Sequence, residues 1–193
     1  GNLFYNIAER GIYLDRGGGT FYVANNTVAS CGEGIISGGT VTAIHLKNNI
    51  ITDISVVGGY HLEIANSTVA AASTATNLMF YQTSGSVRIH WGGPSYTTVP
   101  SWISGSLKGQ GSVTQNPNFV NPGAANYHLT AGSLAIDTGV SVSEFETILQ
   151  SRFGTSLLRD FDGDVRPAIA AWDIGADEFI PTPPAPPQNL RIV

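Results

Sequence analysis

Six side chains in the first half of the chain carry groups that could contact or act on a sugar polymer. They alternate with apolar residues in short runs, and side chains alternate faces along a strand, so we expect them to point to solvent. One outward column would hold Tyr22, His45, Glu63 and Arg88, and a neighbouring column would hold Lys47 and His90. A tyrosine ring can stack on a sugar, and charged groups can bind its hydroxyls and carboxylates. The pattern therefore favours a carbohydrate-contacting strip.

Two other interpretations of these columns stay open. A polysaccharide lyase needs a base that removes the proton next to a carboxylate and a cation that stabilises the resulting charge. The residues with this chemistry are His45, Lys47, Arg88 and His90. The columns contain one acid, Glu63, whereas a lyase or glycoside hydrolase is expected to show a calcium cluster or a long cleft. The third interpretation is a solvated sheet face in a structural stalk or adhesin spacer. We expect carbohydrate contact without a catalytic centre in this chain.

A second candidate site is a run of alternating carboxylates near the end of the chain. Asp160, Asp162 and Asp164 could supply three oxygen ligands to Ca²⁺ from one loop. The alternative is a turn whose carboxylates pair with Arg159 or Arg166 and accept hydrogen bonds from backbone amides. Ca²⁺ is the only cofactor that the sequence indicates, because it contains no glycine-rich phosphate loop and no zinc-type spacing of Cys and His.

The elements that would position these side chains are short strands in a repeat. Three similar runs occupy residues 21–28, 44–51 and 62–69, and their asparagines are Asn25, Asn48 and Asn66. The first step is 23 residues and the second is 18. Each run is too short to bury its apolar face alone, so stacked coils of a β-solenoid are predicted. We expect the asparagines at the corners, where Asn tolerates left-handed backbone angles and can bond to its equivalent in the next coil.

Motifs in both halves resemble a known family. The first half contains Asn-Asn-Thr-Val and Gly-Ile-Tyr-Leu, and the second half contains residues 116–122, 126–129, 132–139, 159–167 and 173–179. These runs resemble bacterial right-handed parallel β-helix repeat proteins and their C-terminal segment. The sequence departs from the family at Leu134, where Pro is usual, and at Asp177, where an aromatic residue is common. The family includes polysaccharide lyases, other carbohydrate-active enzymes and surface proteins, so the resemblance implies the fold and only indicates the function.

The predicted fold class is all-β: a right-handed parallel β-helix with a loop-rich C-terminal cap and one short helix. We divide the chain into β-helix coils (residues 1–112), a C-terminal closing segment (113–180), and a Pro-rich linker with the first strand of a fibronectin type III-like domain (181–193). The helix is expected over residues 142–153, capped by Ser141 or Ser143, over the open end or flank of the solenoid. Thr98 and Pro100 fit the start of another short helix.

Composition limits the function classes. Charged residues are 12% of the chain and glycine contributes 23 residues, which suits short strands and turns. The net charge of −5 argues against nucleic acid as a partner, and the chain has no apolar run long enough for a membrane span. Cys31 is the single cysteine and is expected to be a small packed residue. The linker into a further module predicts a secreted or cell-surface protein. We also expect polysaccharide as a partner, and self-association through the open N-terminal coil.

Overall fold

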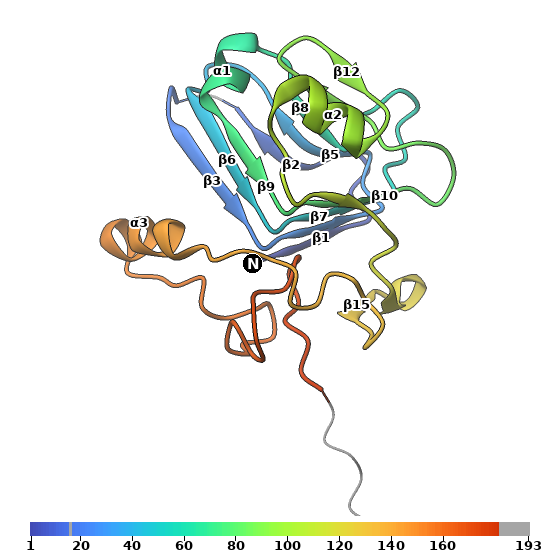
Figure 1. Cartoon of the computed structure of the whole chain (residues 1–193), viewed down its shortest axis with the longest axis vertical. Coiled ribbons are helices and arrows are strands. Elements are labelled where there is room, and N and C mark those ends of the chain that lie inside the picture. The colour runs from blue at the N-terminus through green and yellow to red at the C-terminus, as the bar shows by residue number, and fades with distance from the viewer. Residues whose placement is uncertain (16, 182–193) are drawn as a thin grey trace, which may run out of the picture.

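The computed structural model describes residues 1–15 and 17–181 and shows a β-solenoid of about four turns (Figure 1). The prediction of a parallel β-solenoid is confirmed, and the right-handedness of the solenoid stays a prediction. The first sheet contains β1 (Leu3–Tyr5), β4 (Thr27–Ala29), β7 (Ile50–Thr52), β10 (Met79–Tyr81) and β13 (Val113–Thr114), all parallel. The third sheet contains β3 (Thr20–Ala24), β6 (Ala43–Lys47) and β9 (Thr74–Thr76).

The second sheet lies between these two in chain order. It contains β2 (Arg10–Leu14), β5 (Glu33–Ser37), β8 (Leu62–Ile64) and β11 (Ile89–Trp91) in parallel, with β12 (Ser95–Tyr96) antiparallel at its edge. Alternate residues of all three sheets point into one continuous core. The register stacks Val28, Ile51 and Phe80 in the first sheet, and Ile35, Leu62 and Ile89 in the second. Stacking therefore buries faces that no single strand could bury.

Asparagine side chains of successive coils bond to one another at the corner between the third and first sheets, and so keep the coils in register there. Asn25 and Asn48 have positive φ angles of 55° and 51°, and Asn48 Nδ2 donates to Asn25 Oδ1 at 3.0 Å. The next residue forms a second ladder, in which Asn26 Nδ2 donates to Asn49 Oδ1 at 2.9 Å. Asn2 Nδ2 donates in turn to Asn26 Oδ1 at 3.2 Å. The predicted corner and ladder roles of Asn25 and Asn48 are confirmed.

The same prediction is wrong for Asn66. This residue is the N-cap of α1 (Ser67–Ala72), and its Oδ1 accepts hydrogen bonds from the backbone amides of Thr68 and Val69. The corner equivalent to Asn48 is Asn77, with φ of 49°, which lies 29 residues further along the chain. Asn is favoured both at left-handed corners and at helix N-caps, so the motif alone does not distinguish them.

Two longer helices cover parts of the solenoid. α2 (Val99–Ser106) begins at Thr98, whose side chain accepts a bond from Ser101 N, and has Pro100 in its first turn, as predicted. It closes the C-terminal end of the core, where Trp102 is fully buried against the rings of Phe80 and Trp91. α2 therefore closes this end of the solenoid, a role that the sequence did not predict for it.

The expected helix near residue 142 is α3 (Ser143–Phe153), with two glutamates in its first turn and Arg152 in its last. Neither predicted serine caps it, because the cap position is Val142, which forms no capping side-chain bond. The helix lies on the flank of the solenoid beside β3 (Figure 1). A cavity of about 470 Å³ separates it from the first coil, where Phe4, Ile12 and Phe21 are only partly buried. Self-association through this end stays a prediction.

The closing segment, residues 113–180, runs along the outer face of the first sheet. It contains the hairpin β14 (Phe119–Asn121) and β15 (Asn126–Leu129), joined by a 3₁₀ turn (Pro122–Ala124). Leu129, Ala135 and Ile174 pack against Ile50 and Met79, the outward residues of β7 and β10. None of the helices in the described part of the chain has the length and apolar character that a bilayer crossing needs. The predicted linker and fibronectin-like strand lie outside the described residues, apart from Pro181.

Replacement of Asn49 by alanine should lower the free energy of unfolding by about 2 to 4 kcal/mol, because four hydrogen bonds, three of them buried, lose their partner. Asn49 Oδ1 accepts from the backbone and side-chain nitrogens of Asn26, and its Nδ2 donates to the carbonyls of Val23 and Lys47. The matched variant Asn66→Ala removes only a helix cap and should cost about 1 kcal/mol. Urea unfolding measures both, and equal losses would contradict the different roles assigned to the two residues.

Candidate functional site

The outer face of the second sheet and the residues beside it carry a group of aromatic and charged side chains that contact one another. The register places His90 beside Glu63, then Ile36 and Tyr13 on successive coils. His90 Nδ1 lies 3.0 Å from Glu63 Oε1, and His90 Nε2 lies 3.0 Å from the carbonyl oxygen of Gly93. Both ring nitrogens therefore face acceptor oxygens. Tyr13, at the other end of the column, is 48% exposed.

Two arginines lie over tyrosine rings on the same side. The Arg10 guanidinium is 4.6 Å from the ring centroid of Tyr13, and that of Arg88 is 5.3 Å from the ring of Tyr60. Arg10 also pairs with Glu33 at 3.1 Å. Tyr60 in turn packs against His90, with ring centroids 5.2 Å apart. We call this surface the tyrosine–arginine face; its residues are Arg10, Tyr13, Glu33, Tyr60, Glu63, Arg88 and His90.

The structure corrects the predicted columns. Tyr22 is registered with His45 in the third sheet, and the next residue in that row is Thr74 rather than Glu63. Glu63 belongs to the second sheet, and Arg88 precedes β11 rather than lying in a strand. The cause is α1, which occupies the position that the 18-residue step had assigned to a corner. The six candidates thus form two groups on different sheets.

Two members of the group on the third sheet, Tyr22 and Lys47, contact α3 or the residues just before it. Lys47 Nζ lies 2.5 Å from Glu144 Oε1, donates to the carbonyl of Ser141, and sits 5.2 Å from the Phe145 ring. This partner holds the pKa of Glu144 below its usual value. Tyr22 contacts both the His45 ring and Phe145, at centroid distances of 5.2 and 5.0 Å. Lys47 therefore anchors a helix.

The four catalytic candidates do not come together. His45 and Lys47 lie in β6, whereas Arg88 and His90 lie at the second sheet. His45 Nδ1 bonds to Thr74 Oγ1 at 2.9 Å, and burial lowers its pKa. Glu63, Arg88 and His90 are absent from the linings of five of the cavities that the described residues form. The geometry supplies an open surface with paired charges, which suits binding better than proton abstraction.

His61 supports the tyrosine–arginine face from beneath. Its Nδ1 accepts the backbone amide of Arg88 at 3.1 Å, so the proton of the neutral ring is on Nε2, which donates to the carbonyl of Tyr81. The residue is fully buried, and burial lowers its pKa to about 4. A second proton on the ring would point Nδ1–H at the Arg88 amide. His61 is therefore structural, as expected for a buried histidine with two backbone partners.

The predicted calcium ligands do not converge as a set. Asp160 Oδ1 accepts the backbone amides of Asp162, Gly163 and Asp164, each at 2.8 Å, and Oδ2 accepts that of Glu178 at 3.1 Å. These bonds match the alternative in which the carboxylate organises a turn. Of the two arginines expected as partners, Arg159 donates to the carbonyl of Gly163 within the turn.

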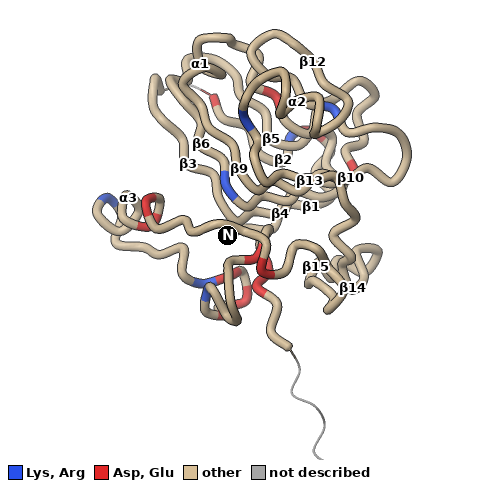
Figure 2. The backbone as a smooth tube through the Cα atoms, viewed as in Figure 1, with Lys and Arg blue, Asp and Glu red and all other residues tan. Residues whose placement is uncertain are grey.

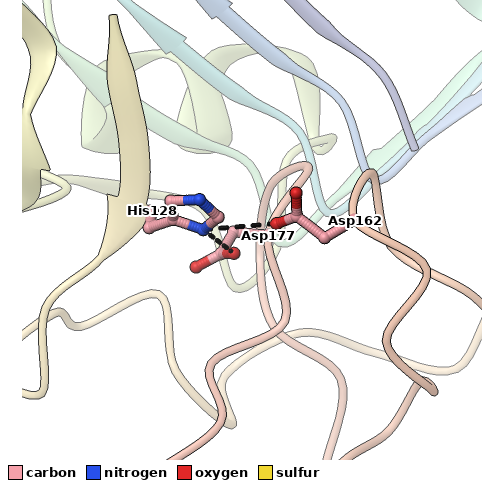
Figure 3. Close-up of side chains that lie close together, drawn as sticks. All are labelled: His128, Asp162 and Asp177. Carbon is pink, nitrogen blue, oxygen red and sulfur yellow. Dashed lines mark hydrogen bonds and ion pairs between the residues drawn. The ribbon is translucent and has the colours of Figure 1, made fainter. Parts of the chain in front are cut away.

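One carboxylate of that turn, that of Asp162, instead meets Asp177 and a histidine that the sequence had not grouped with them. His128 Nδ1 lies 2.9 Å from Asp177 Oδ1 and 3.3 Å from Asp162 Oδ2 (Figure 3). These three are the only His, Cys, Asp or Glu residues in the described ranges 1–15 and 17–181 grouped closely enough to hold a metal ion. The two aspartates raise the pKa of His128 against the effect of its partial burial. We call this group the His128 cluster.

A buried ion pair holds the last turn of the closing segment. The side chain of Arg166 is 0% exposed and donates to Glu178 Oε2 at 3.2 Å and to the carbonyls of Gly175 and Ala176. The Glu178 carboxylate also accepts hydrogen bonds from the backbone amides of Ala168 and Asp173. Burial raises the pKa of Glu178, and these amides and the Arg166 charge oppose that shift. Figure 2 shows the acidic residues gathered in this part of the chain.

Sequence reasoning missed much of the tyrosine–arginine face. Tyr60 precedes β8 in a connecting segment, and Arg10 and Tyr13 lie in β2 of the first coil, a strand that contains no asparagine. One available signal was the weaker register of Ile12 with Ile35, which the structure confirms as a strand pair. Cys31 is fully buried, and burial raises its thiol pKa, in agreement with a packed residue.

Comparison of the chain with protein-family models, with curated proteins and with solved structures gives no match.

The buried His61 should make the protein less stable in mild acid. The unfolded state takes up the proton near pH 6.5 and the folded state only near pH 4, so the free energy of unfolding should fall by about 3 kcal/mol between these values. Above pH 6.5 this contribution is fully present. The difference between wild type and His61→Gln in urea unfolding at pH 7 and pH 4.5 isolates it. Equal pH dependence in both proteins would contradict the assigned protonation state.

Arg166→Met should destabilise the protein by about 3 to 5 kcal/mol, because it leaves the Glu178 carboxylate buried without its cation. Arg159→Met is the matched control, since Arg159 is exposed and in the same turn, and should cost under about 1 kcal/mol. Thermal unfolding followed by circular dichroism compares the two variants. A loss of similar size in both would show that the buried pair has no special role.

Proposed function

We propose that the chain is a carbohydrate-contacting β-solenoid module of an extracellular bacterial protein, without a catalytic centre of its own. The observation that carries the proposal is the tyrosine–arginine face. Three of the six predicted candidates, Glu63, Arg88 and His90, meet there, and both Arg88 and His90 contact the ring of Tyr60. Aromatic rings that contact a sugar and charged groups that bind its polar substituents are the two components such a surface requires.

The charges favour an acidic polymer as the ligand. Arg10 and Arg88 lie over the tyrosine rings, so a uronate ring stacked on Tyr13 or Tyr60 would place its carboxylate near a guanidinium. A guanidinium can bind a carboxylate with two parallel hydrogen bonds, which an ammonium group cannot do. Coils repeat along the solenoid axis at about 4.8 Å, so the face extends in one direction, as a linear chain of sugars does.

The alternative of a polysaccharide lyase is less well supported. Its base and cation would have to come from His45, Lys47, Arg88 or His90, and these lie on two sheets. The hydrogen bonds of His90 to Glu63 and Gly93 leave neither ring nitrogen directed at a substrate. The spacer alternative is favoured by the third sheet, where Phe145 of α3 contacts the ring of Tyr22 and the side chain of Lys47.

Size-exclusion chromatography with soluble polygalacturonate tests the proposal. We expect the protein to elute with intact polymer, and Tyr60→Ala and Arg88→Ala each to weaken retention at least tenfold. Tyr22→Ala is the control, because this tyrosine is exposed but lies on the third sheet, and it should bind as wild type does. A fall in polymer size would replace the proposal with the enzyme alternative. Absence of binding to both acidic and neutral polymers would favour the spacer.

A further inference from the structure

We propose that the His128 cluster binds one divalent transition-metal ion, and that Zn²⁺ fits it best. The site is independent of the tyrosine–arginine face. Its ligand atoms are His128 Nδ1, Asp162 Oδ2 and Asp177 Oδ1, and all three lie within 4.8 Å of one another. They come from three segments of the chain: strand β15, the turn after Asp160, and the end of the closing segment.

Two of the three distances between ligand atoms are close to those expected around one tetrahedral ion. Zn²⁺ binds nitrogen and carboxylate oxygen at about 2.0 to 2.2 Å, which places tetrahedral ligands about 3.3 Å apart. His128 Nδ1 is 2.9 Å from Asp177 Oδ1 and 3.3 Å from Asp162 Oδ2. An ion could therefore take the position between these atoms with small side-chain shifts. Water would supply the fourth ligand from the exposed side, where His128 and Asp162 are 43% and 41% exposed.

The donor set favours Zn²⁺ over Ca²⁺. Ca²⁺ takes six to eight oxygen ligands at longer distances, whereas this cluster offers one imidazole nitrogen and two carboxylates. Imidazole with a small number of ligands suits Zn²⁺ and its transition-metal neighbours. The carboxylate that could have added more oxygens, that of Asp160, already accepts four backbone amides. This occupancy separates the proposed site from the calcium loop that the sequence pattern indicates.

The ligand side chains are positioned by bonds outside the cluster. Asp177 is 8% exposed, and its second oxygen accepts the backbone amide of Leu129 at 2.7 Å. That bond leaves Oδ1 directed at His128. The turn that carries Asp162 is fixed through its amide by Asp160, and the His128 ring packs on Phe161 with centroids 5.0 Å apart. Outer contacts of this kind fix ligand orientation in metal sites.

The electrostatic surroundings attract a cation. Residues 159–178 contain six acidic side chains and two arginines, and Asp160, Asp162 and Asp177 all raise the pKa of His128. A bound ion would connect the β14–β15 hairpin to the last turn of the closing segment.

Isothermal titration calorimetry with ZnCl₂ on the metal-free protein tests the site. At pH 7.5 we expect one Zn²⁺ per chain, and a melting temperature that rises with Zn²⁺ and returns with EDTA. His128→Gln and Asp162→Asn should each weaken binding at least tenfold.

Asp164→Asn is the control, since it lies in the same exposed turn but outside the cluster, and it should bind Zn²⁺ as wild type does. Far-ultraviolet circular dichroism of the metal-free variants shows that the substitutions leave the fold intact. The proposal is overturned if wild type takes up no Zn²⁺, if it binds Ca²⁺ more tightly than Zn²⁺, or if His128→Gln and Asp162→Asn bind as tightly as wild type.

Discussion

Each coil of the solenoid must reach its corner at the same height as the coil before it, and most of the structure depends on this constraint. Backbone hydrogen bonds between parallel strands form only when the register is kept, and a slip of one residue would turn every apolar side chain outward. The asparagine ladders of residues 2, 26 and 49 and of residues 25 and 48 fix the register at one corner. The ladder bonds join side chains to side chains and to backbone, so they specify the stacking more precisely than apolar contacts can.

The same constraint explains which parts of the fold could be predicted. The 23-residue step between Asn25 and Asn48 corresponds to one coil, and it placed Tyr22 beside His45 correctly. The next coil carries the extra turn of α1, whose Val69 and Ala70 pack into the core, so its corner moved to Asn77. An insertion that leaves the strands in register costs the solenoid little, and local sequence gives no sign of it. Glu63 and Arg88 were therefore assigned to the wrong sheet, because their positions were inferred from the 18-residue step.

In the closing segment, prediction from the sequence is limited for a different reason. The motif around Asp160 was recognisable, and its role as a turn was one of two readings of the residues. The meeting of His128 with Asp162 and Asp177 depends on how three distant segments fold onto the first sheet. No spacing in the sequence encodes it. Likewise, the buried pair of Arg166 and Glu178 depends on a tertiary contact, in a region where charged residues would ordinarily be exposed.

The cap formed by α2 has a consequence for how such a chain can change in length. Trp102 fills the end of the core behind Phe80 and Trp91, and it matches the cross-section of the last coil only. Duplication or deletion of a whole coil in the interior would preserve that match, because each coil presents a similar stack of inward side chains to the next. Evolution could therefore lengthen or shorten the solenoid by internal duplication while α2 and the last coil remained a fixed terminal unit.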